Sequence, residues 1–357
     1  MTDFIEESED EFEGEDIPQL YEHHNIKVEK GQVSMRIDKF IVTRIANATR
    51  NKVQNNCDAG NILVNGKSVK SSYKIKPLDE ISIQLNVPPR SIEVIPENIP
   101  IDIVFEDDYL AIINKKPGMV VHPGFGNYSG TLVNALAYHF KNLPSRPNKI
   151  GDDMVLDRIG LVHRIDKNTS GTILIAKTER AMTILSKLFF DRNIDRKYVA
   201  IAWGDMKGDN GTIIGNVGRD LKNRKVMTVF PEGSEHGKHA VTHWKIIKRY
   251  GYITLVECKL ETGRTHQIRV HFKSIGHPLF NDNEYGGDRI LKGLNTSKYK
   301  QFIENCFQIL PRQALHAKTL GFEHPITGKP MFFDSELPED MRQVLEKWDN
   351  FIKNKEI

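Results

Sequence analysis

The spacing of apolar positions in the first quarter of the chain predicts a small compact domain. Within residues 35–45 apolar side chains recur at the spacing of one helical face, which predicts an amphipathic helix. Thr49 is a suitable N-cap for a second helix, which we expect to extend through Cys57. Residues 62–64 form an apolar run that ends in an Asn-Gly hairpin turn, and a further strand is expected over residues 80–85. Two helices and a small sheet follow from this pattern.

In the rest of the chain, short apolar runs bounded by glycine or charged residues predict strands. These runs are residues 101–104, 110–113, 172–176 and 197–204, two runs between residues 240 and 261, and a strand with a hairpin over residues 314–325. Helical spacing predicts helices over residues 179–190 and 339–350. A shorter helix is expected to begin with Thr265 as its N-cap and to bury Ile268 and Ile275. This mixture of elements indicates an α+β protein.

Composition divides the chain into a tail, two domains and a linker. Residues 1–30 are acidic and poor in periodic apolar positions, which predicts a disordered tail. The small domain takes residues 33–85. Residues 86–100 contain four prolines and are expected to form an extended linker. The larger domain takes residues 101–357, a length that is sufficient for a core of its own.

Charge is distributed unevenly along the chain. Of 47 acidic residues, nine lie in residues 1–16, which contain no lysine or arginine. The rest of the chain therefore holds 38 acidic and 50 basic residues, a net charge of +12, which suits a polyanionic partner such as a nucleic acid. Basic surfaces are also common on proteins that bind no nucleic acid, so charge alone leaves both interpretations open.

Cysteine usage and hydropathy indicate a protein of the reducing cytoplasm. The three cysteines are scattered and form no Cys-x-x-Cys pair, which argues against a disulfide framework and a thiolate zinc site. His266, His271 and His277 lack a carboxylate or cysteine at a known ligand spacing, so we expect no metal. No apolar run approaches the ~20 residues of a membrane span, and the N-terminus lacks the pattern of a signal peptide. We expect no membrane partner.

The most informative segment is a charged loop directly before the predicted strand 172–176. Residues 163–171 read His-Arg-Ile-Asp-Lys-Asn-Thr-Ser-Gly and place Arg164 and Asp166 at the edge of a sheet. A charged loop on a rigid scaffold is the usual layout of a catalytic site. For a lone aspartate, a turn in which the carboxylate accepts backbone hydrogen bonds is the simpler interpretation.

The loop resembles the His-Arg-Leu-Asp-x-x-Thr-Ser-Gly signature of the RluA/RluD-type RNA pseudouridine synthases and departs from it only at Ile165. Three further segments carry the resemblance: residues 114–124, where Lys116 replaces the commoner proline; the Lys-Tyr segment at 197–198; and Thr-Gly-Arg-x-His-Gln-Ile-Arg-x-His at 262–271. The resemblance covers about residues 101–333. It implies a catalytic domain with a mixed, mainly antiparallel sheet flanked by helices.

The small domain carries a second resemblance. Residues 36–66 are similar to the alpha-L RNA-binding domain, which typically contacts the RNA backbone through its second helix and the adjoining loop. Four basic residues are the candidates for phosphate contacts, which set affinity rather than sequence choice: Arg36, Arg50, Lys52 and Lys67. A solvated charged face is the alternative interpretation.

The resemblance makes Asp166 the catalytic aspartate. The reaction breaks the N-glycosidic bond of uridine, rotates the base and rejoins it through carbon. The aspartate acts either as a nucleophile at the ribose or as the base that removes a proton from the 2′ carbon, and the sequence does not choose between these routes. Both routes need an ionised Asp166 in a semi-enclosed pocket, so we predict an ion pair with the family-matched Arg269. Tyr198 is expected to stack on the target base and to take part in proton transfer at C5.

Other residues of the catalytic domain are expected to contact the RNA. Arg164 corresponds to the family's residue that enters the RNA stack as the uridine leaves it, and extruding a base costs about a few kcal/mol. The neighbouring His163 is a further candidate RNA contact, and Ile268 and Leu315 are expected to form pocket walls. No cofactor is expected, because the reaction is an isomerisation without redox or net hydrolysis.

Two other functions account for parts of the sequence. An RNA chaperone would combine the alpha-L domain with an inactive catalytic fold, but the presence of Asp166, Tyr198 and Arg269 together argues against it. A glycoside hydrolase would need a second carboxylate near the loop, and none is signalled. Within the family the chain most resembles the D-type enzymes of large-subunit ribosomal RNA, with the C type next. Other large-subunit sites and tRNA remain open as substrates, and a monomer is the default for the family.

Overall fold

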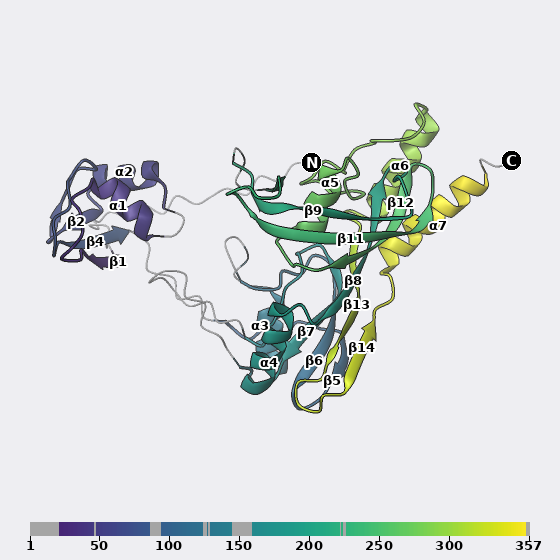
Figure 1. Ribbon diagram of the computed structural model, residues 1–357, viewed down its shortest axis with the longest axis horizontal. Helices are drawn as coiled ribbons and strands as arrows, with labels where there is room; N and C mark the ends of the chain where they lie inside the picture. Colours follow the sequence, from purple (N-terminus) through teal and green to yellow (C-terminus); the bar gives the residue numbers. More distant parts are fainter. Residues whose placement is uncertain are drawn as a thin grey trace, which may run out of the picture. The chain divides into compact units, whose positions relative to one another are not determined.

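The computed structural model describes residues 21–45, 48–85, 94–123, 127, 129–144, 159–221, 223 and 226–354. The described chain forms two compact units, one within residues 21–85 and the other within residues 94–354 (Figure 1). Among the helices of these ranges, none is long and apolar enough to cross a membrane.

The small unit packs two helices against a four-stranded antiparallel sheet with the order β1-β4-β2-β3. Its elements are β1 (Tyr21–Lys27), α1 (Ile37–Arg44), α2 (Arg50–Asp58), β2 (Ile62–Val64), β3 (Lys67–Ser68) and β4 (Glu80–Leu85). The predicted cap is confirmed, because the Thr49 side chain accepts a hydrogen bond from the backbone N–H of Lys52. The hairpin turn is also present, with Asn65 and Gly66 both at positive φ.

One strand of this sheet corrects the predicted extent of the acidic tail. Residues 1–30 were expected to be disordered, whereas Tyr21–Lys27 form β1, which pairs antiparallel with β4. The segment Tyr-Glu-His-His-Asn-Ile-Lys has no alternation of apolar residues, so its strand state depends on backbone pairing with β4. Residues 1–20 of the predicted tail lie outside the described residues.

The predicted linker, residues 86–100, is divided by the structure. Residues 86–93 lie outside the described residues, whereas residues 94–100 pack on the larger unit. The side-chain amide of Asn134 donates to the carbonyl oxygen of Ile95 at 2.9 Å, and the Glu97 carboxylate accepts from the backbone N–H of Gly130 at 3.0 Å.

The larger unit is built on a ten-stranded sheet with the order β10-β9-β11-β12-β8-β13-β7-β6-β5, and β14 pairs with β13 beside this path. Its strands are β5 (Ile103–Glu106), β6 (Leu110–Lys115), β7 (Ser170–Ala176), β8 (Asp195–Trp203), β9 (Asn210–Arg219), β10 (Met227–Phe230), β11 (Lys238–Arg249), β12 (Ile253–Leu260), β13 (Leu315–Glu323) and β14 (Pro330–Asp334). Within the described strands, β7 and β13 form the only parallel pair. The mixed, mainly antiparallel α+β architecture predicted by the resemblance is confirmed.

Five helices cover the two faces of this sheet (Figure 1). They are α3 (Leu132–His139), α4 (Glu179–Phe190), α5 (Gln267–Ser274), α6 (Ser297–Ile309) and α7 (Glu339–Lys353). Because side chains alternate along a strand, β8 directs Tyr198 and Ala200 toward the core shared with α3 and α5. Val199 and Ile201 pack in the core shared with α6 and α7. Tyr198 therefore lies on the same face as α5.

Helices α4 and α7 were predicted, whereas α3 and α6 were not. Helix α3 begins in a capping box, in which the Thr131 side chain accepts from the backbone N–H of Asn134 and Asn134 returns a bond to Thr131. An asparagine at the third helical position is not the glutamate or glutamine that marks this motif in a sequence. Helix α6 begins at a threonine cap, Thr296, within a polar segment.

The close approach of β7 and β13 depends on one glycine. Gly171 has φ +111°, and a Cβ atom at this position would lie 2.2 Å from the carbonyl oxygen of Ala317. Glycine is the residue that tolerates both the positive φ and the contact. The loop with Asp166 enters β7 next to β13, and β13 pairs on its other edge with Tyr198 of β8.

Candidate active site

Two buried basic side chains hold the backbone of the loop that carries Asp166. The Lys115 amino group donates to the carbonyl oxygen of Lys167 at 2.9 Å and to two other carbonyls, and burial lowers its pKa to about 7. The Arg312 guanidinium donates to the carbonyl oxygen of Asn168 at 2.9 Å. Asp340, at the start of α7, accepts two hydrogen bonds from Arg312 at 2.7 and 2.9 Å. Segments far apart in the sequence thus position the two residues after Asp166.

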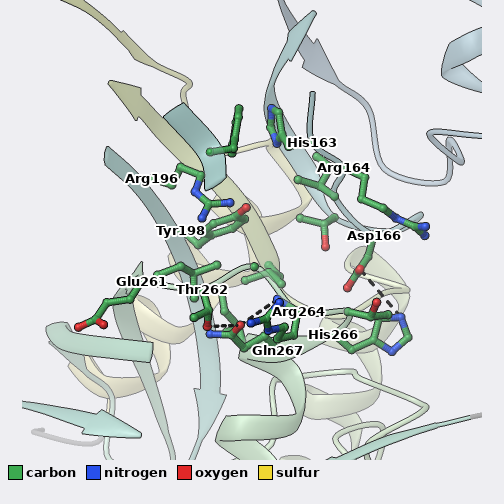
Figure 2. A pocket seen from close by; sticks show the side chains of 18 of the residues that line it. His163, Arg164, Asp166, Arg196, Tyr198, Glu261, Thr262, Arg264, His266 and Gln267 are labelled. Carbon is green, nitrogen blue, oxygen red and sulfur yellow. Dashed lines mark hydrogen bonds and ion pairs between the residues drawn. The ribbon is translucent and has the colours of Figure 1, made fainter. Parts of the chain in front are cut away.

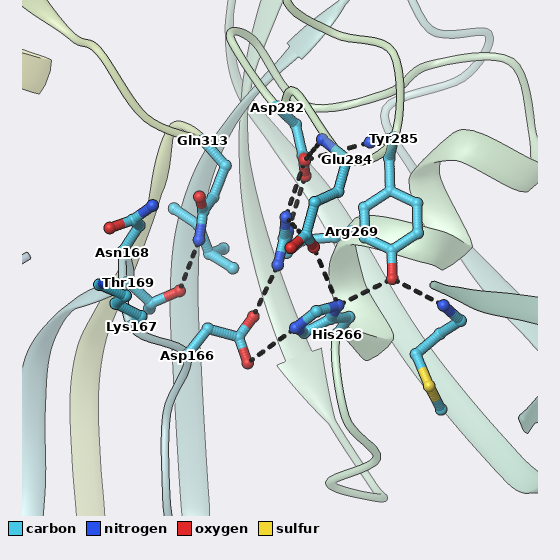
Figure 3. Close-up of polar contacts among 12 residues, drawn as sticks. Asp166, Lys167, Asn168, Thr169, His266, Arg269, Asp282, Glu284, Tyr285 and Gln313 are labelled. Atoms are coloured by element: carbon cyan, nitrogen blue, oxygen red, sulfur yellow. Dashed lines mark hydrogen bonds and ion pairs between the residues drawn. The ribbon is translucent and has the colours of Figure 1, made fainter. Parts of the chain in front are cut away.

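The predicted ion pair between Asp166 and Arg269 is present. Arg269 Nη1 lies 3.4 Å from Asp166 Oδ2 (Figure 3), and the arginine side chain is only 4% exposed. Asp282, which is fully buried, accepts from Nε and Nη2 of the same guanidinium at 2.7 and 2.8 Å. Glu284 accepts a further hydrogen bond from Nη2 at 2.8 Å. A bidentate partner behind Arg269 fixes the orientation in which it meets Asp166.

These carboxylates also decide the charge of the arginine. Burial alone would lower the pKa of Arg269, but the hydrogen bonds and charge of Asp282, together with Asp166, raise that pKa above its ordinary value. The cation is therefore permanent at any pH at which the protein is folded. Sequence reasoning did not assign Asp282 or Glu284 to the site, because both lie beyond the 262–271 motif and approach Arg269 only in the folded chain.

His266 supplies a second contact to the carboxylate of Asp166. Its Nε2 lies 3.9 Å from Asp166 Oδ1, and its Nδ1 lies 2.8 Å from the Tyr285 hydroxyl and 3.3 Å from Glu284 (Figure 3). Burial lowers the pKa of His266, which favours the neutral imidazole. His266 adopts the left-handed conformation with φ +54°, a strained backbone that aims the ring at Asp166. Among the described residues no cluster of metal-ligating side chains is found.

The start of helix α5 differs from the expectation. Thr265 was expected to cap it, but the N-cap residue is His266, which makes no side-chain cap hydrogen bond. The side-chain carbonyl of Gln267 accepts instead from the backbone N–H of Arg264 at 2.9 Å and from the Thr262 hydroxyl at 2.8 Å. Ile275, expected to face inward, is 40% exposed because the helix ends at Ser274. The buried Gln267 therefore holds the start of α5, a role that was expected of Thr265.

Asp166 and Tyr198 line one pocket, shown in Figure 2. Tyr198 is buried on β8, and burial raises the pKa of its hydroxyl. This hydroxyl makes no hydrogen bond with any described side chain, so it is available to a ligand. The predicted walls, Ile268 and Leu315, line the same pocket and are both buried. The four residues come from three different elements and the loop before β7.

His163 and Arg164, two predicted RNA contacts in the loop that carries Asp166, lie in different environments. The Arg164 side chain is exposed at the pocket and directed away from Tyr198 (Figure 2). His163 stacks on Phe189 with ring centroids 4.5 Å apart, and its Nε2 accepts from the backbone N–H of Leu174 at 2.8 Å. Burial lowers the pKa of His163 to about 3, so the ring is neutral. His163 therefore attaches the loop to β7, although its ring also lines the pocket.

In the small unit, the four basic candidates divide into two pairs. Asp38 of α1 is fully buried and accepts from Arg36 at 2.9 Å and from Arg50 at 3.3 Å. The hydrogen bonds from Arg36 hold the pKa of Asp38 well below its ordinary value, despite the burial. Lys52 and Lys67 are exposed and form no ion pair with described residues. Arg36 and Arg50 thus stabilise the fold through Asp38 and also place positive charge at the surface.

Comparison with known proteins identifies the family to which this chain belongs. Residues 109–274 match the family described as RNA pseudouridylate synthase, and residues 35–81 match the S4 domain. A protein of Chlorobaculum parvum named "Uncharacterized RNA pseudouridine synthase" is 47% identical over 324 residues, which cover 90% of this chain and 96% of that protein. The chain belongs to the RNA pseudouridine synthase family. This family isomerises uridine to pseudouridine in RNA, and the expected enzyme class and RNA partner are confirmed.

Further relatives agree with this assignment. "Ribosomal large subunit pseudouridine synthase D" of Zymomonas mobilis is 40% identical and covers 88% of this chain and 94% of its own length. The protein of the same name from Vibrio parahaemolyticus is 38% identical over 89% of this chain and 92% of its own. A solved structure, "Human RNA Pseudouridylate Synthase Domain Containing 4", has a TM-score of 0.51 at 23% identity and covers 70% of this chain and 93% of that one, which shows the fold.

Proposed function

We propose that this pseudouridine synthase modifies uridines in large-subunit ribosomal RNA and that Asp166 is its catalytic aspartate. The observation that carries the assignment of Asp166 is its position in the pocket, in an ion pair with the buried and carboxylate-held Arg269. The choice of substrate is supported by the names of the Zymomonas and Vibrio relatives. In this proposal the enzyme acts as a monomer in the cytoplasm. It needs no cofactor, because an isomerisation neither consumes nor supplies electrons.

In this mechanism the pocket residues divide the work between the ribose and the base. Asp166 acts on the ribose, either by covalent capture at C1′ or by removing the proton from C2′. Arg269 orients the carboxylate in both routes, and the neutral His266 faces its other oxygen. The bond between N1 and C1′ breaks, and the bond between C5 and C1′ forms after the base has rotated. Tyr198 stacks on the detached base and helps to move the proton from C5.

Further RNA contacts, in the pocket and in the small domain, hold the substrate while one nucleotide leaves the stack. Arg164 is exposed beside Asp166 and fills the gap that the extruded uridine leaves. His163 contacts the RNA through the ring face that lines the pocket, and Ile268 and Leu315 enclose the base. In the small domain, Lys52 and Lys67 contact phosphates, with Arg36 and Arg50 contributing their exposed sides.

The proposal is tested by tritium release from C5-labelled uridine in unmodified large-subunit ribosomal RNA, with tRNA as a parallel substrate. We expect release by the wild type and none by Asp166→Asn. Asp288→Asn, which changes an exposed aspartate outside the pocket, is the matched control and should behave as wild type. Release from tRNA alone would contradict the substrate, and equal release by Asp166→Asn would contradict the catalytic role. RNA binding without release from any RNA would favour a non-catalytic RNA-binding protein.

A further inference from the structure

Phe190 is an unusually exposed aromatic residue at the rim of the active-site pocket. It is the last residue of α4, and its side chain is 86% exposed although it lines the same pocket as Asp166 and Tyr198. The preceding Phe189 behaves differently, because it stacks on His163. A phenylalanine exposed to this degree contributes little to the core, and its place among the pocket-lining residues leaves its ring face accessible to a ligand with an apolar face.

The ligand that contacts Phe190 must also suit a positively charged rim. Four arginines line the pocket: Arg164, Arg192, Arg196 and Arg264. Only Arg192 has a carboxylate within 4.0 Å among the described residues, and that contact, to Glu261, is long at 3.9 Å. The Arg196 guanidinium lies over the ring of Phe189, and its Nε is buried without a hydrogen-bond partner. These cations are available to anionic groups of a ligand.

Arg192 lies two residues beyond Phe190 and connects the aromatic residue with the charged rim. It has φ +63°, a left-handed conformation that is uncommon for a residue other than glycine. The turn ends α4 so that Phe190 and Arg192 both line the pocket. An aromatic face next to cations is the combination by which proteins bind unpaired nucleotides, because the base stacks and the phosphate pairs with arginine.

We propose that Phe190 is a stacking platform for a nucleobase that flanks the target uridine, and that Arg192 and Arg196 bind the adjoining phosphates. The inference rests on the proposed function and adds a second binding position, at the rim of the pocket that holds the target base. A flanking base unstacks when its neighbour is extruded, and Phe190 offers it a new stacking surface. Stacking of this kind tolerates every base, so Phe190 contributes affinity and positioning more than sequence choice.

The test uses the full-length protein and a transcript fragment that the wild type modifies. We expect Phe190→Ala to weaken RNA binding and raise KM by about 5- to 150-fold, the range that corresponds to removal of one base–aromatic stack. Phe190→Trp should bind as well as wild type, because it keeps an aromatic face. Phe332→Ala is the matched control, since Phe332 is 64% exposed on β14 and does not line the pocket. Thermal unfolding of all variants should match wild type, because both side chains are exposed.

A second arm identifies the stacked nucleotide. Abasic sites are placed singly at the positions flanking the target uridine, and the effect of Phe190→Ala is measured on each RNA. At one position the abasic RNA should bind wild type and Phe190→Ala equally, because the base that stacks on Phe190 is already absent. Equal KM for wild type and Phe190→Ala on intact RNA, or an equal loss for Phe332→Ala, would overturn the inference. Wild type that modifies no RNA would instead overturn the proposed function, so the two failures are distinguishable.

Discussion

Both domains bury a charged side chain that is held by ion pairs, Asp38 in the small domain and Arg269 in the catalytic domain, and the two differ in sign and in surroundings. In the small domain Asp38 is fully buried and is held by arginines that are 38% and 50% exposed. In the catalytic domain Arg269 is 4% exposed and is held by Asp282, which is fully buried, and by Asp166 and Glu284. The partners of Asp38 remain in contact with water, whereas the nearest partner of Arg269 does not. Loss of the buried group should therefore cost more in the catalytic domain.

The largest effect is expected from Arg269→Met. The substitution leaves a buried Asp282 without its counter-ion, which should lower the free energy of unfolding by about 3–5 kcal/mol. Loss of the charge facing Asp166 should lower kcat by on the order of 10³-fold. Chemical denaturation and tritium release measure the two effects. Arg269→Met with Asp282→Leu should recover much of the stability but none of the activity, and recovery of both would contradict the role of the Asp166 pair.

A smaller effect on rate is expected from Asp340→Asn, which weakens the anchor of Arg312 without removing a group from the pocket. The loop after Asp166 should lose its fixed position, and misplacement of about 1 Å lowers rates by on the order of 10²-fold. Single-turnover kinetics should show a lower rate at saturating RNA with unchanged RNA affinity. Glu339→Gln changes the neighbouring exposed carboxylate and is the control. A change confined to thermal stability would contradict a positioning role.

Asp38→Ala tests the cost of losing the buried charge of the small domain. Arg36 and Arg50 would lose a partner but remain solvated, so we expect a loss of about 1–3 kcal/mol, confined to the small domain. Hydrogen exchange should become faster in α1 and α2 and remain unchanged in the sheet of the catalytic domain. Asp58→Ala, at an exposed position of α2, should leave exchange unchanged. A loss in the free energy of unfolding equal to that of Arg269→Met would contradict the idea that solvated partners reduce the cost of losing the buried charge.

The same aspartate predicts a pH dependence for the small domain. Because the pKa of Asp38 is lower in the folded than in the unfolded state, its ionisation stabilises the fold. This contribution is complete above the unfolded-state value of about 4 and is lost as the pH falls toward the folded-state value. Exchange in α1 and α2, corrected for intrinsic rates, should therefore increase from pH 5 to pH 3. Asp38→Asn should show a smaller increase, and an identical profile would exclude Asp38 as the cause.

The smallest effect is expected from the exposed lysines. Lys52→Ala with Lys67→Ala should leave stability unchanged and reduce the dependence of RNA affinity on salt, by about 0.7–0.9 in the logarithmic slope for each phosphate that is no longer neutralised. Arg36→Ala with Arg50→Ala should instead lower the stability of the small domain, because Asp38 loses its two charged partners. Binding measured over a series of salt concentrations separates the two pairs. An unchanged slope for the lysine pair would place the RNA contacts elsewhere.

Local sequence signals predicted much of the fold. Helix α4 has the predicted bounds of residues 179–190, and α2 begins at the predicted cap, Thr49. Strand β7 also lies where an Ile-rich run indicated it. These elements succeed because apolar periodicity and capping act over a few residues. Strand β1 failed for the opposite reason, since only pairing with β4 makes its polar segment extended.

The sequence by itself predicted the family and the reaction, which the comparisons confirm, and it proposed Asp166, Tyr198 and Arg269 as catalytic residues, because their motifs are contiguous and specific. Tertiary structure alone decided that Asp282 orients Arg269 and that Asp340 anchors the loop through Arg312. It also decided that the exposed Phe190 lies among the residues that line the pocket of Asp166. Burial and ion pairing depend on which distant segments meet, and a local pattern contains no information about that meeting.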